Sequence, residues 1–275
     1  MSSGRVRIVA QLSDPHIVEA GELCIGGIDT EGYLLAALDT LHALDPRPDL
    51  LLCTGDLVND GRVEQYRNLR RLLEGVAVPV RLVAGNHDDP QLLREVFPER
   101  VELGADGPLR YVIDDLDPLR IVVLDTHIDG RPDGHLDPAQ LRWLDERLAE
   151  AADRPCLVAM HHPPFATGIG HMDAMGLDRT SVAGLEDVLR AYDNVERVLC
   201  GHLHRTITRR FAGTVAMTAP SCAHAVALDL RPGVTPGTWN REPSGLALHH
   251  WSAASGVVSH VRAVGEFPTK RFGEA

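Results

Sequence analysis

Residues 198–204 of the 275-residue chain read Val-Leu-Cys-Gly-His-Leu-His, a short apolar run that leads directly into a glycine and two histidines. The apolar residues 198–200 favour a buried strand. In an extended segment alternate side chains face the same way, so His202 and His204 can reach two adjacent metal ions. The stretch therefore predicts a metal site at the end of a strand.

Four other predicted strands end in the same manner. Residues 6–12, 50–53, 80–83 and 156–160 lead into Asp14-Pro15-His16, Gly55-Asp56, Gly85-Asn86-His87-Asp88 and His161-His162-Pro163-Pro164. The carboxyl ends of strands in an α/β sheet form a common rim where ligands bind. We therefore expect the five clusters to converge in space.

Each cluster taken alone has an ordinary structural explanation. Asp-x-His and Gly-Asp are common in turns, and Gly-Asn-His-Asp can be a left-handed turn capped by Asp88. The pair His161-His162 before two prolines can be a simple strand exit. Five such clusters in succession, each after a predicted strand, are better explained by one shared site.

Helical patterns alternate with the strands over the first two-thirds of the chain. Helices are predicted at 33–44, 63–73, 90–97, 137–150 and 181–192, with a further strand at 121–124. Asp137 can cap the fourth helix, and Pro138 suits its first turn. This alternation predicts a layered α/β fold.

The pattern changes after Gly201. Strands without intervening helices are predicted at 206–211, 214–218, 246–251 and 257–261, which indicates an antiparallel section beside or beneath the first sheet. Residues 229–243 predict a long surface loop, and 265–275 a peripheral tail. We therefore expect a catalytic domain at 1–228, followed by a segment at 229–275 that completes the sheet or forms a cap.

Composition limits the classes of function. The net charge of -12 argues against a surface for long nucleic acid, because such binding depends on Lys and Arg that neutralise phosphates. A small anionic substrate remains possible, since bound metal ions can reverse the local charge. Residues 1–4 carry no signal-peptide pattern, and no apolar run approaches the roughly 20 residues that cross a bilayer. The five cysteines form no CxxC pair, so buried reduced thiols in a cytoplasmic protein are expected.

The candidate ligands are chemically coherent. They combine oxygen donors with imidazoles and include no thiolate: Asp14, Asp56, Asn86, His16, His161, His202 and His204. That mixture suits Mn, Fe or Zn, and Asp56 is the candidate for an aspartate that bridges two ions. Two divalent ions would lower the pKa of a bound water to near 7 and offset the charge of a phosphate. Phosphoryl transfer needs such charge neutralisation and an in-line nucleophile more than a covalent relay.

Together the motifs resemble the signature of the calcineurin-like metallophosphoesterases over about residues 6–204. Within that family the chain looks like the glycerophosphodiesterase and class III cyclic-nucleotide phosphodiesterase branch, on the stretches 54–59, 85–89 and 160–165. The resemblance implies an α/β fold with four layers, α/β/β/α, and a dinuclear site at the edge of the sandwich. The last part of the chain would correspond to a small cap or oligomerisation element.

The resemblance also implies roles for single residues. Asp14, His16, Asp56 and His204 would hold one metal ion, and Asp56, Asn86, His161 and His202 the other. His87 would correspond to the outer-sphere histidine that stabilises the transition state or protonates the leaving alkoxide. The catalytic set is thus Asp56, Asn86 and His87, with two divalent or mixed-valence ions of Mn, Fe, Zn or Co as cofactors.

Further polar residues have weaker patterns. Asn59 and His171 are candidates for substrate contact, although each can equally be an ordinary loop residue. His162 could orient its neighbour, and His127 could approach the site after the strand at 121–124. Four histidines show no ligand spacing with each other and are expected to be solvated or packed: His224, His249, His250 and His260.

The predicted reaction is hydrolysis of a small phosphodiester, a 3′,5′-cyclic nucleotide or a glycerophosphodiester, by in-line attack of a metal-bound hydroxide. A phosphomonoesterase or nuclease on the same scaffold is the first alternative. The second is a metal-stabilised scaffold without catalysis, which should have lost ligands or the outer-sphere histidine. We expect a homo-oligomer, a dimer or larger, with no membrane partner.

Overall fold

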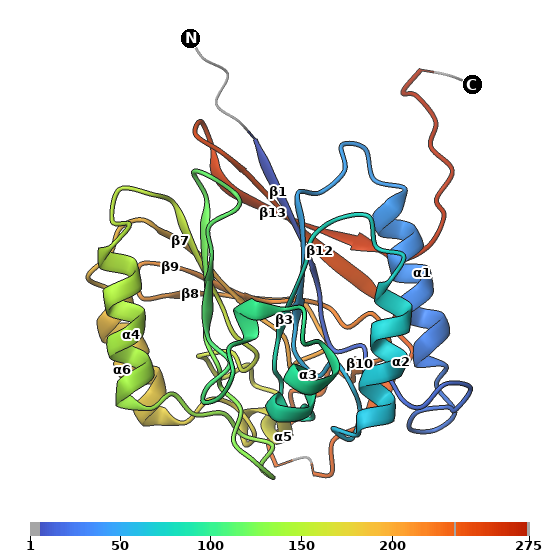
Figure 1. Cartoon of the computed structure of the whole chain (residues 1–275). Coiled ribbons are helices and arrows are strands. Elements are labelled where there is room, and N and C mark those ends of the chain that lie inside the picture. The colour runs from blue at the N-terminus through green and yellow to red at the C-terminus, as the bar shows by residue number, and fades with distance from the viewer. Residues whose placement is uncertain (1–5, 234, 274–275) are drawn as a thin grey trace.

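The computed structural model describes residues 6–233 and 235–273, so the predictions for residues 1–4 and for the end of the tail, 274–275, lie outside the described residues. Two β-sheets pack face to face, with α1 and α2 on one outer side and α4 and α6 on the other (Figure 1). This is the α/β/β/α arrangement that the resemblance implies. Among the described helices, none has the length and apolar character to cross a membrane.

The first sheet has the strand order β13-β12-β1-β2-β3. Its central strands are parallel, while β12 runs antiparallel to β1 and β13 antiparallel to β12. The strands are β1 (Arg7–Leu12), β2 (Leu50–Thr54), β3 (Val80–Val83), β12 (Gly245–Ser252) and β13 (Gly256–Ala263). The helices joined to these strands are α1 (Thr30–His42), α2 (Val63–Leu73) and α3 (Pro90–Val96).

The second sheet has the strand order β4-β5-β6-β7-β9-β8. Strands β5, β6, β7 and β9 run parallel, and the edge strands β4 and β8 are antiparallel to their neighbours. The strands are β4 (Tyr111–Ile113), β5 (Arg120–Val123), β6 (Cys156–Ala159), β7 (Val195–Cys200), β8 (Ile207–Phe211) and β9 (Thr214–Thr218). The remaining elements are η1 (Val101–Leu103), α4 (Pro138–Ala149), α5 (Gly170–Asp173), α6 (Arg179–Leu189), β10 (Ala225–Val226) and β11 (Trp239–Asn240).

The four predicted C-terminal strands are divided between the two sheets. Strands β12 and β13 extend the first sheet beyond β1, whereas β8 and β9 extend the second sheet beyond β7. Because β9 runs parallel to β7, the prediction of an antiparallel section is wrong for this contact. The elements β4, α5, β10 and β11 are too short for a periodic pattern and were not predicted.

The side-chain period of the central strands explains the layers. In β5 the buried residues Ile121 and Val123 belong to the core between the sheets, while Val122 packs with Leu144 of α4 and Leu185 of α6. Strands covered on both faces read as continuous apolar runs, as these do. The five cysteines are buried and free, as predicted.

A chain of buried polar groups connects the two sheets beneath the rim. Gln11 of β1 donates from Nε2 to Thr54 Oγ1 and to the carbonyl of Cys200, both at 2.9 Å. Its Oε1 lies 2.9 Å from Nε2 of His249, whose Nδ1 lies 2.8 Å from Ser259 Oγ. Because buried polar groups need partners, these bonds hold β1, β2, β7 and β12 in one relative position.

Candidate metal centre

The strand ends of both sheets meet at one rim, and four predicted ligands form a tight group there. Nε2 of His16 lies 3.1 Å from Nε2 of His204 and 3.6 Å from Oδ2 of Asp56. Nε2 of His204 lies 3.4 Å from Oδ1 of Asp14. All four side chains are buried, and one donor atom from each falls within 4.8 Å of the others.

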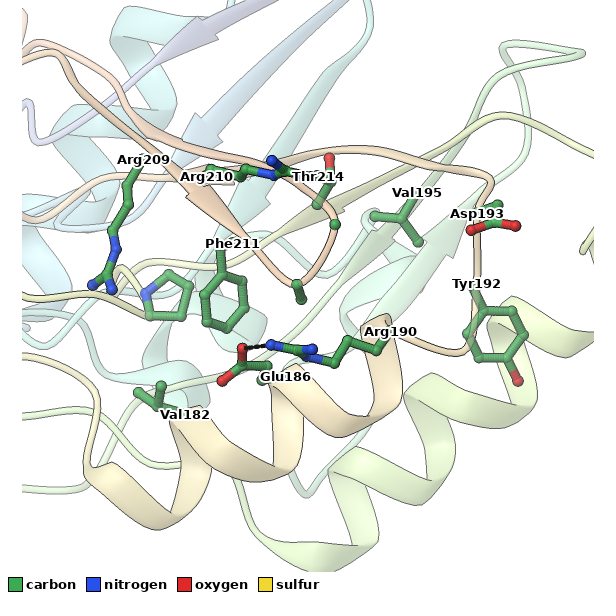
Figure 2. Close-up of a pocket in the computed structure, with 13 residues that line it drawn as sticks. Val182, Glu186, Arg190, Tyr192, Asp193, Val195, Arg209, Arg210, Phe211 and Thr214 are labelled. Carbon is green, nitrogen blue, oxygen red and sulfur yellow. Dashed lines mark hydrogen bonds and ion pairs between the residues drawn. The ribbon is translucent and has the colours of Figure 1, made fainter.

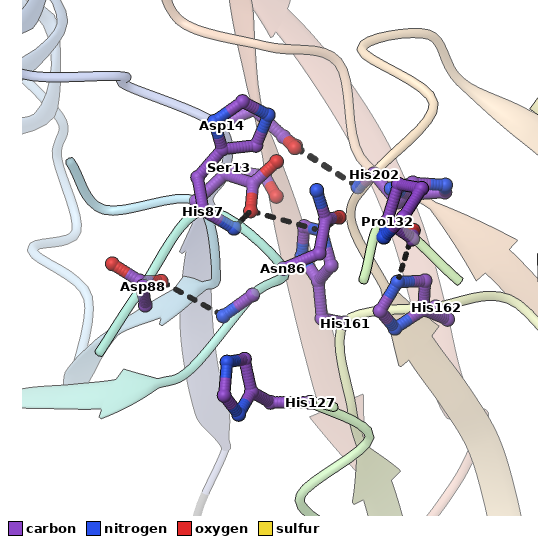
Figure 3. Close-up of polar contacts among 12 residues, drawn as sticks. Ser13, Asp14, Asn86, His87, Asp88, His127, Pro132, His161, His162 and His202 are labelled. Carbon is purple, nitrogen blue, oxygen red and sulfur yellow. Dashed lines mark hydrogen bonds and ion pairs between the residues drawn. The ribbon is translucent and has the colours of Figure 1, made fainter. Parts of the chain in front are cut away.

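The other predicted ligands gather on the far side of Asp56. Nε2 of His161 lies 3.3 Å from Oδ1 of Asp56 and 3.2 Å from Oδ1 of Asn86, and the ring of His202 lies 5.1 Å from that of His161 (Figure 3). The two oxygens of Asp56 thus face different histidines. That geometry suits a carboxylate that bridges two cations.

Hydrogen bonds set the orientation of two imidazoles. Nδ1 of His161 donates to the carbonyl of Thr54 at 2.8 Å, and Nδ1 of His204 donates to the carbonyl of His224 at 2.9 Å. Each ring therefore turns Nε2 toward a carboxylate, and either a proton or a cation must lie between them. Backbone carbonyls that orient ligating histidines in this way are typical of metal sites.

The electrostatics of the group indicate that a cation is needed. Within the described residues, Asp14 and Asp56 form ion pairs only with histidines. Burial raises the pKa of Asp14 to about 7. Burial also opposes charge on Asp56 and His161, but their mutual attraction holds the pKa of Asp56 well below its usual range and raises that of His161 to about 9. Two buried carboxylates whose ion pairs in the described residues are all with histidines fit a site that binds metal ions.

The backbone at the rim is unusual. In the described part of the chain six non-glycine residues have positive φ, and five of them are predicted ligands: Asp14 (52°), His16 (46°), Asp56 (47°), His202 (69°) and His204 (50°). Left-handed backbone costs free energy for residues with a Cβ and persists where the surrounding structure enforces it. Its concentration here marks the rim as a functional site.

Comparisons with known proteins agree with this geometry. A family model described as calcineurin-like phosphoesterase matches residues 8–206. The chain belongs to this family. It is 35% identical over 260 residues to a probable glycerophosphodiester phosphodiesterase, GpdQ, of Arcobacter nitrofigilis, and the match covers 94% of each chain. It is 32% identical to the 3′,5′-cyclic adenosine monophosphate phosphodiesterase CpdA of Pseudomonas aeruginosa, over 88% of this chain and 85% of that protein.

Among solved structures, a dimetal phosphatase from Danio rerio superposes with a TM-score of 0.63. It is 15% identical to this chain and the match covers 94% of this chain and 99% of the other, so it shows the fold alone. The predictions of the family, of the α/β sandwich and of a metal-dependent phosphodiesterase are thereby confirmed.

The histidine expected to assist the reaction, His87, lies beside Asp56, the predicted bridging carboxylate. The backbone N–H of His87 donates to Oδ1 of Asp56 at 3.0 Å, and Nδ1 of its ring donates to the carbonyl of Asn59 at 2.6 Å. The ring lies 4.7 Å from that of His16, edge to face. Burial opposes its protonation, but the charge on Asp56 and the Asn59 carbonyl raise its pKa overall.

Asp88 shapes the turn that carries Asn86 and His87. Its buried carboxylate accepts hydrogen bonds from the backbone N–H groups of Gly85, Leu57 and Val58 at 2.8, 3.1 and 3.3 Å. It also accepts one from Tyr66 Oη at 3.1 Å. Asp88 thus caps the turn, as the local sequence suggested, and the same turn carries two residues of the candidate site.

Two further histidines behave differently from ligands. Both ring nitrogens of His162 are occupied, because Nδ1 lies 2.8 Å from Thr126 Oγ1 and Nε2 lies 3.2 Å from the carbonyl of Pro132 (Figure 3). His162 therefore supports the loop of His161. His127 lines a neighbouring cavity of about 530 Å³ together with Asp89 and Asp125, close to the turn of His87.

Sequence reasoning missed one residue of the site. His224 was expected to be solvated or packed like His249, His250 and His260, but its ring lies 4.5 Å from His204 and 5.4 Å from His16. One nitrogen from each of these three rings falls within 4.8 Å of the others. No local motif could reveal it, because His224 follows β9 in an irregular segment.

Another cavity lies on the outer face of the second sheet. It has a volume of about 540 Å³ and lies between α6 and the β8–β9 turn, where Glu186 and Arg190 form an ion pair (Figure 2). It reaches the loop after His161 only through Pro164 and contains none of the predicted ligands. It is separate from the metal centre.

Proposed function

We propose that this chain hydrolyses small phosphodiesters, 3′,5′-cyclic nucleotides or glycerophosphodiesters, with two metal ions at the rim. The observation that carries this proposal is the position of Asp56, whose Oδ1 and Oδ2 face His161 and His16 at 3.3 and 3.6 Å. The names of the relatives, a glycerophosphodiester phosphodiesterase and a cyclic-nucleotide phosphodiesterase, support the substrate class.

The proposed ligand sets follow the two halves of the site. One ion would be held by Asp14, His16, Asp56 and His204, and the other by Asp56, Asn86, His161 and His202. Bound there, the ions would supply hydroxide at neutral pH and positive charge for the phosphate. The mixture of oxygen and imidazole donors supports Mn, Fe, Zn or Co, which metal analysis of the purified protein would distinguish.

The protein groups around the ions would position the substrate and handle the proton. The amide of Asn86 would hold its ion in place beside His161. His87 would protonate the departing alkoxide, since its Nδ1 is engaged by the Asn59 carbonyl and Nε2 is left for the substrate. Asn59 and His171 remain proposed substrate contacts, the first next to His87 and the second on α5.

Turnover assays would separate the competing functions. With Mn²⁺ added, we expect bis(p-nitrophenyl) phosphate to be hydrolysed faster than p-nitrophenyl phosphate. Preference for the monoester would favour a phosphomonoesterase, and the absence of metal-dependent hydrolysis would favour a scaffold. The net charge of -12 argues against a nuclease that grips duplexes.

A ligand variant tests the bridge directly. We expect Asp56→Ala to lose both ions, because its carboxylate serves both halves of the site. Asp39→Ala is a matched control, since Asp39 is exposed on α1, and it should keep metal and activity. Retention of both ions by Asp56→Ala would contradict the proposed bridge.

An exposed edge strand supports a proposal for the assembly of this chain. The edge strand β13 exposes Val258 (40%) and Val261 (51%), and an exposed edge strand favours pairing with a second copy. Light scattering would test the proposed homo-oligomer.

The free, buried cysteines support a reducing compartment such as the cytoplasm. The division into 1–228 and 229–275 stays a proposal, which limited proteolysis would test.

A further inference from the structure

An aromatic side chain stands next to the metal centre, at the end of a row of rings. Strands β10 and β11 pair antiparallel with Val226 opposite Trp239, and β10 begins directly after His224. The indole of Trp239 therefore lies 6.0 Å from the ring of His224, nearly perpendicular to it, and His224 lies 4.5 Å from the ligand His204. Two ring-to-ring steps thus separate Trp239 from a metal ligand.

Two glycines allow close packing around Trp239. A Cβ on Gly26 would lie 2.4 Å from Cζ2 of Trp239, so the absence of a side chain at Gly26 lets the ring approach the loop. On the other flank, a Cβ on Gly237 would lie 2.1 Å from the ring of His171 on α5. Residues 237–239 are therefore packed between the loop of Gly26 and helix α5.

The loop under Trp239 also connects to the reacting groups. Cys24 and Ile28 form an antiparallel bridge that closes this loop, and Sγ of Cys24 donates to Oδ1 of Asn59 at 3.2 Å. The carbonyl of Asn59 holds the ring of His87. The position of the indole is thus set relative to the catalytic histidine by direct contacts.

Trp239 is nevertheless open to solvent. It is 37% exposed, whereas Trp251, which packs in the core, is 6% exposed. Of the two neighbouring arginines, Arg205 pairs with Glu242, and Arg241 donates to the carbonyl of Gly27. The exposed indole offers a π-face on which an aromatic base can stack, and a glycerol moiety has no aromatic group to use it.

We propose that Trp239 is a specificity-determining residue on which the base of a nucleotide substrate stacks, so that the site favours 3′,5′-cyclic nucleotides over glycerophosphodiesters. The proposal rests on the proposed function and selects between its two substrate classes. A base that extended from a phosphate at the metal centre past His224 would meet the exposed indole. Stacking on an aromatic side chain tolerates any base, so selectivity among purines and pyrimidines should be modest.

Kinetics of Trp239→Ala on two substrates test the proposal. For 3′,5′-cyclic AMP we expect KM to rise about tenfold with little change in kcat, the size typical of losing one stacked base. For glycerophosphoethanolamine, which has no aromatic group, kcat/KM should stay within about twofold. Trp239→Phe should recover most of the loss, because a phenyl ring also stacks.

A second variant moves the indole without removing it. Gly26→Val would force Trp239 from its place, and we expect the same selective rise in KM for 3′,5′-cyclic AMP. Equal losses on both substrates in Trp239→Ala would show a merely structural role and overturn the proposal. So would an unchanged KM for 3′,5′-cyclic AMP.

Binding of a product keeps the two proposals distinguishable. Calorimetry of 5′-AMP with the metal-loaded protein should show about tenfold weaker binding in Trp239→Ala, whether or not either substrate is turned over. If the wild-type protein hydrolyses neither substrate but this difference is found, the proposed function fails and the stacking role stands. Equal affinity of both proteins for 5′-AMP would refute the stacking role.

Discussion

Replacement of His87 by alanine should separate metal binding from proton transfer. The hydrogen bond from His87 to the carboxylate of Asp56 comes from the backbone N–H, at 3.0 Å, and an alanine at this position would retain it. The variant loses only the imidazole, with its bond to the Asn59 carbonyl and its contact with His16. We therefore expect both ions to remain and stability to fall by about 1 kcal/mol, the usual net value of one hydrogen bond.

The expected loss of activity depends on the leaving group. A positioned general acid contributes about 10²- to 10⁴-fold. For a substrate that releases an alkoxide, kcat should fall by that factor, which corresponds to roughly 3–5 kcal/mol of transition-state stabilisation. For bis(p-nitrophenyl) phosphate the loss should be far smaller, because p-nitrophenolate leaves without a proton.

The assay compares kcat for 3′,5′-cyclic AMP and bis(p-nitrophenyl) phosphate in metal-saturated wild type and His87→Ala. Metal content is measured on the same samples, and His260→Ala, an exposed histidine on β13, serves as the control. Equal losses on both substrates would refute proton donation by His87. Loss of an ion would instead assign the side chain to the metal site.

Two further substitutions probe how the rim is built. Gly85→Ala should lower both the metal content and the midpoint of thermal unfolding, because its Cβ would lie 2.2 Å from the backbone nitrogen of Asp56. Gly75→Ala is the control and should change neither quantity, since no atom lies near its Cβ. A Gly85→Ala variant that binds its full complement of metal would contradict this explanation. Gln11→Leu should cost about 1–3 kcal/mol in urea unfolding, since it leaves Nε2 of the buried His249 without a partner. The double variant with His249→Leu should regain part of that loss, and additive losses would show that the pair is not coupled.

The residues at the rim could be predicted from the sequence because each lies close in sequence to the end of a recognisable strand. Each predicted ligand follows an apolar strand within a few residues, so the ends of β1 and β2 place Asp14 and Asp56 without knowledge of the remaining chain. The helix at 63–73 and the strand at 214–218 were predicted with the same bounds as the structure gives. In these segments, periodicity and tertiary packing favour the same structure.

The walls of the site could not be predicted, because they depend on contacts between distant segments. His224 and Trp239 reach the centre through β10 and β11, which have two residues each and no readable period. The sheet to which β8 and β9 belong could not be predicted either, since the sequence pattern of a strand does not indicate which strand it pairs with. The loop at 229–243 was expected as surface, yet its contacts at Gly26 and His171 depend on glycines that local patterns do not single out.

The left-handed backbone at five predicted ligands means that the shape of the rim and its metal-binding side chains can change independently. Backbone hydrogen bonds to neighbouring segments, such as those from Asp14 to Gly55 and from His16 to Asp56, help to hold this conformation. A descendant that replaced the side chain of Asp14 or His204 would therefore keep the shape of the rim while it lost a proposed metal ligand. The surface of the rim, without metal ions, could then bind other molecules. Shared architecture in this family is therefore no proof of turnover, and each member must be judged by the side chains that it presents there.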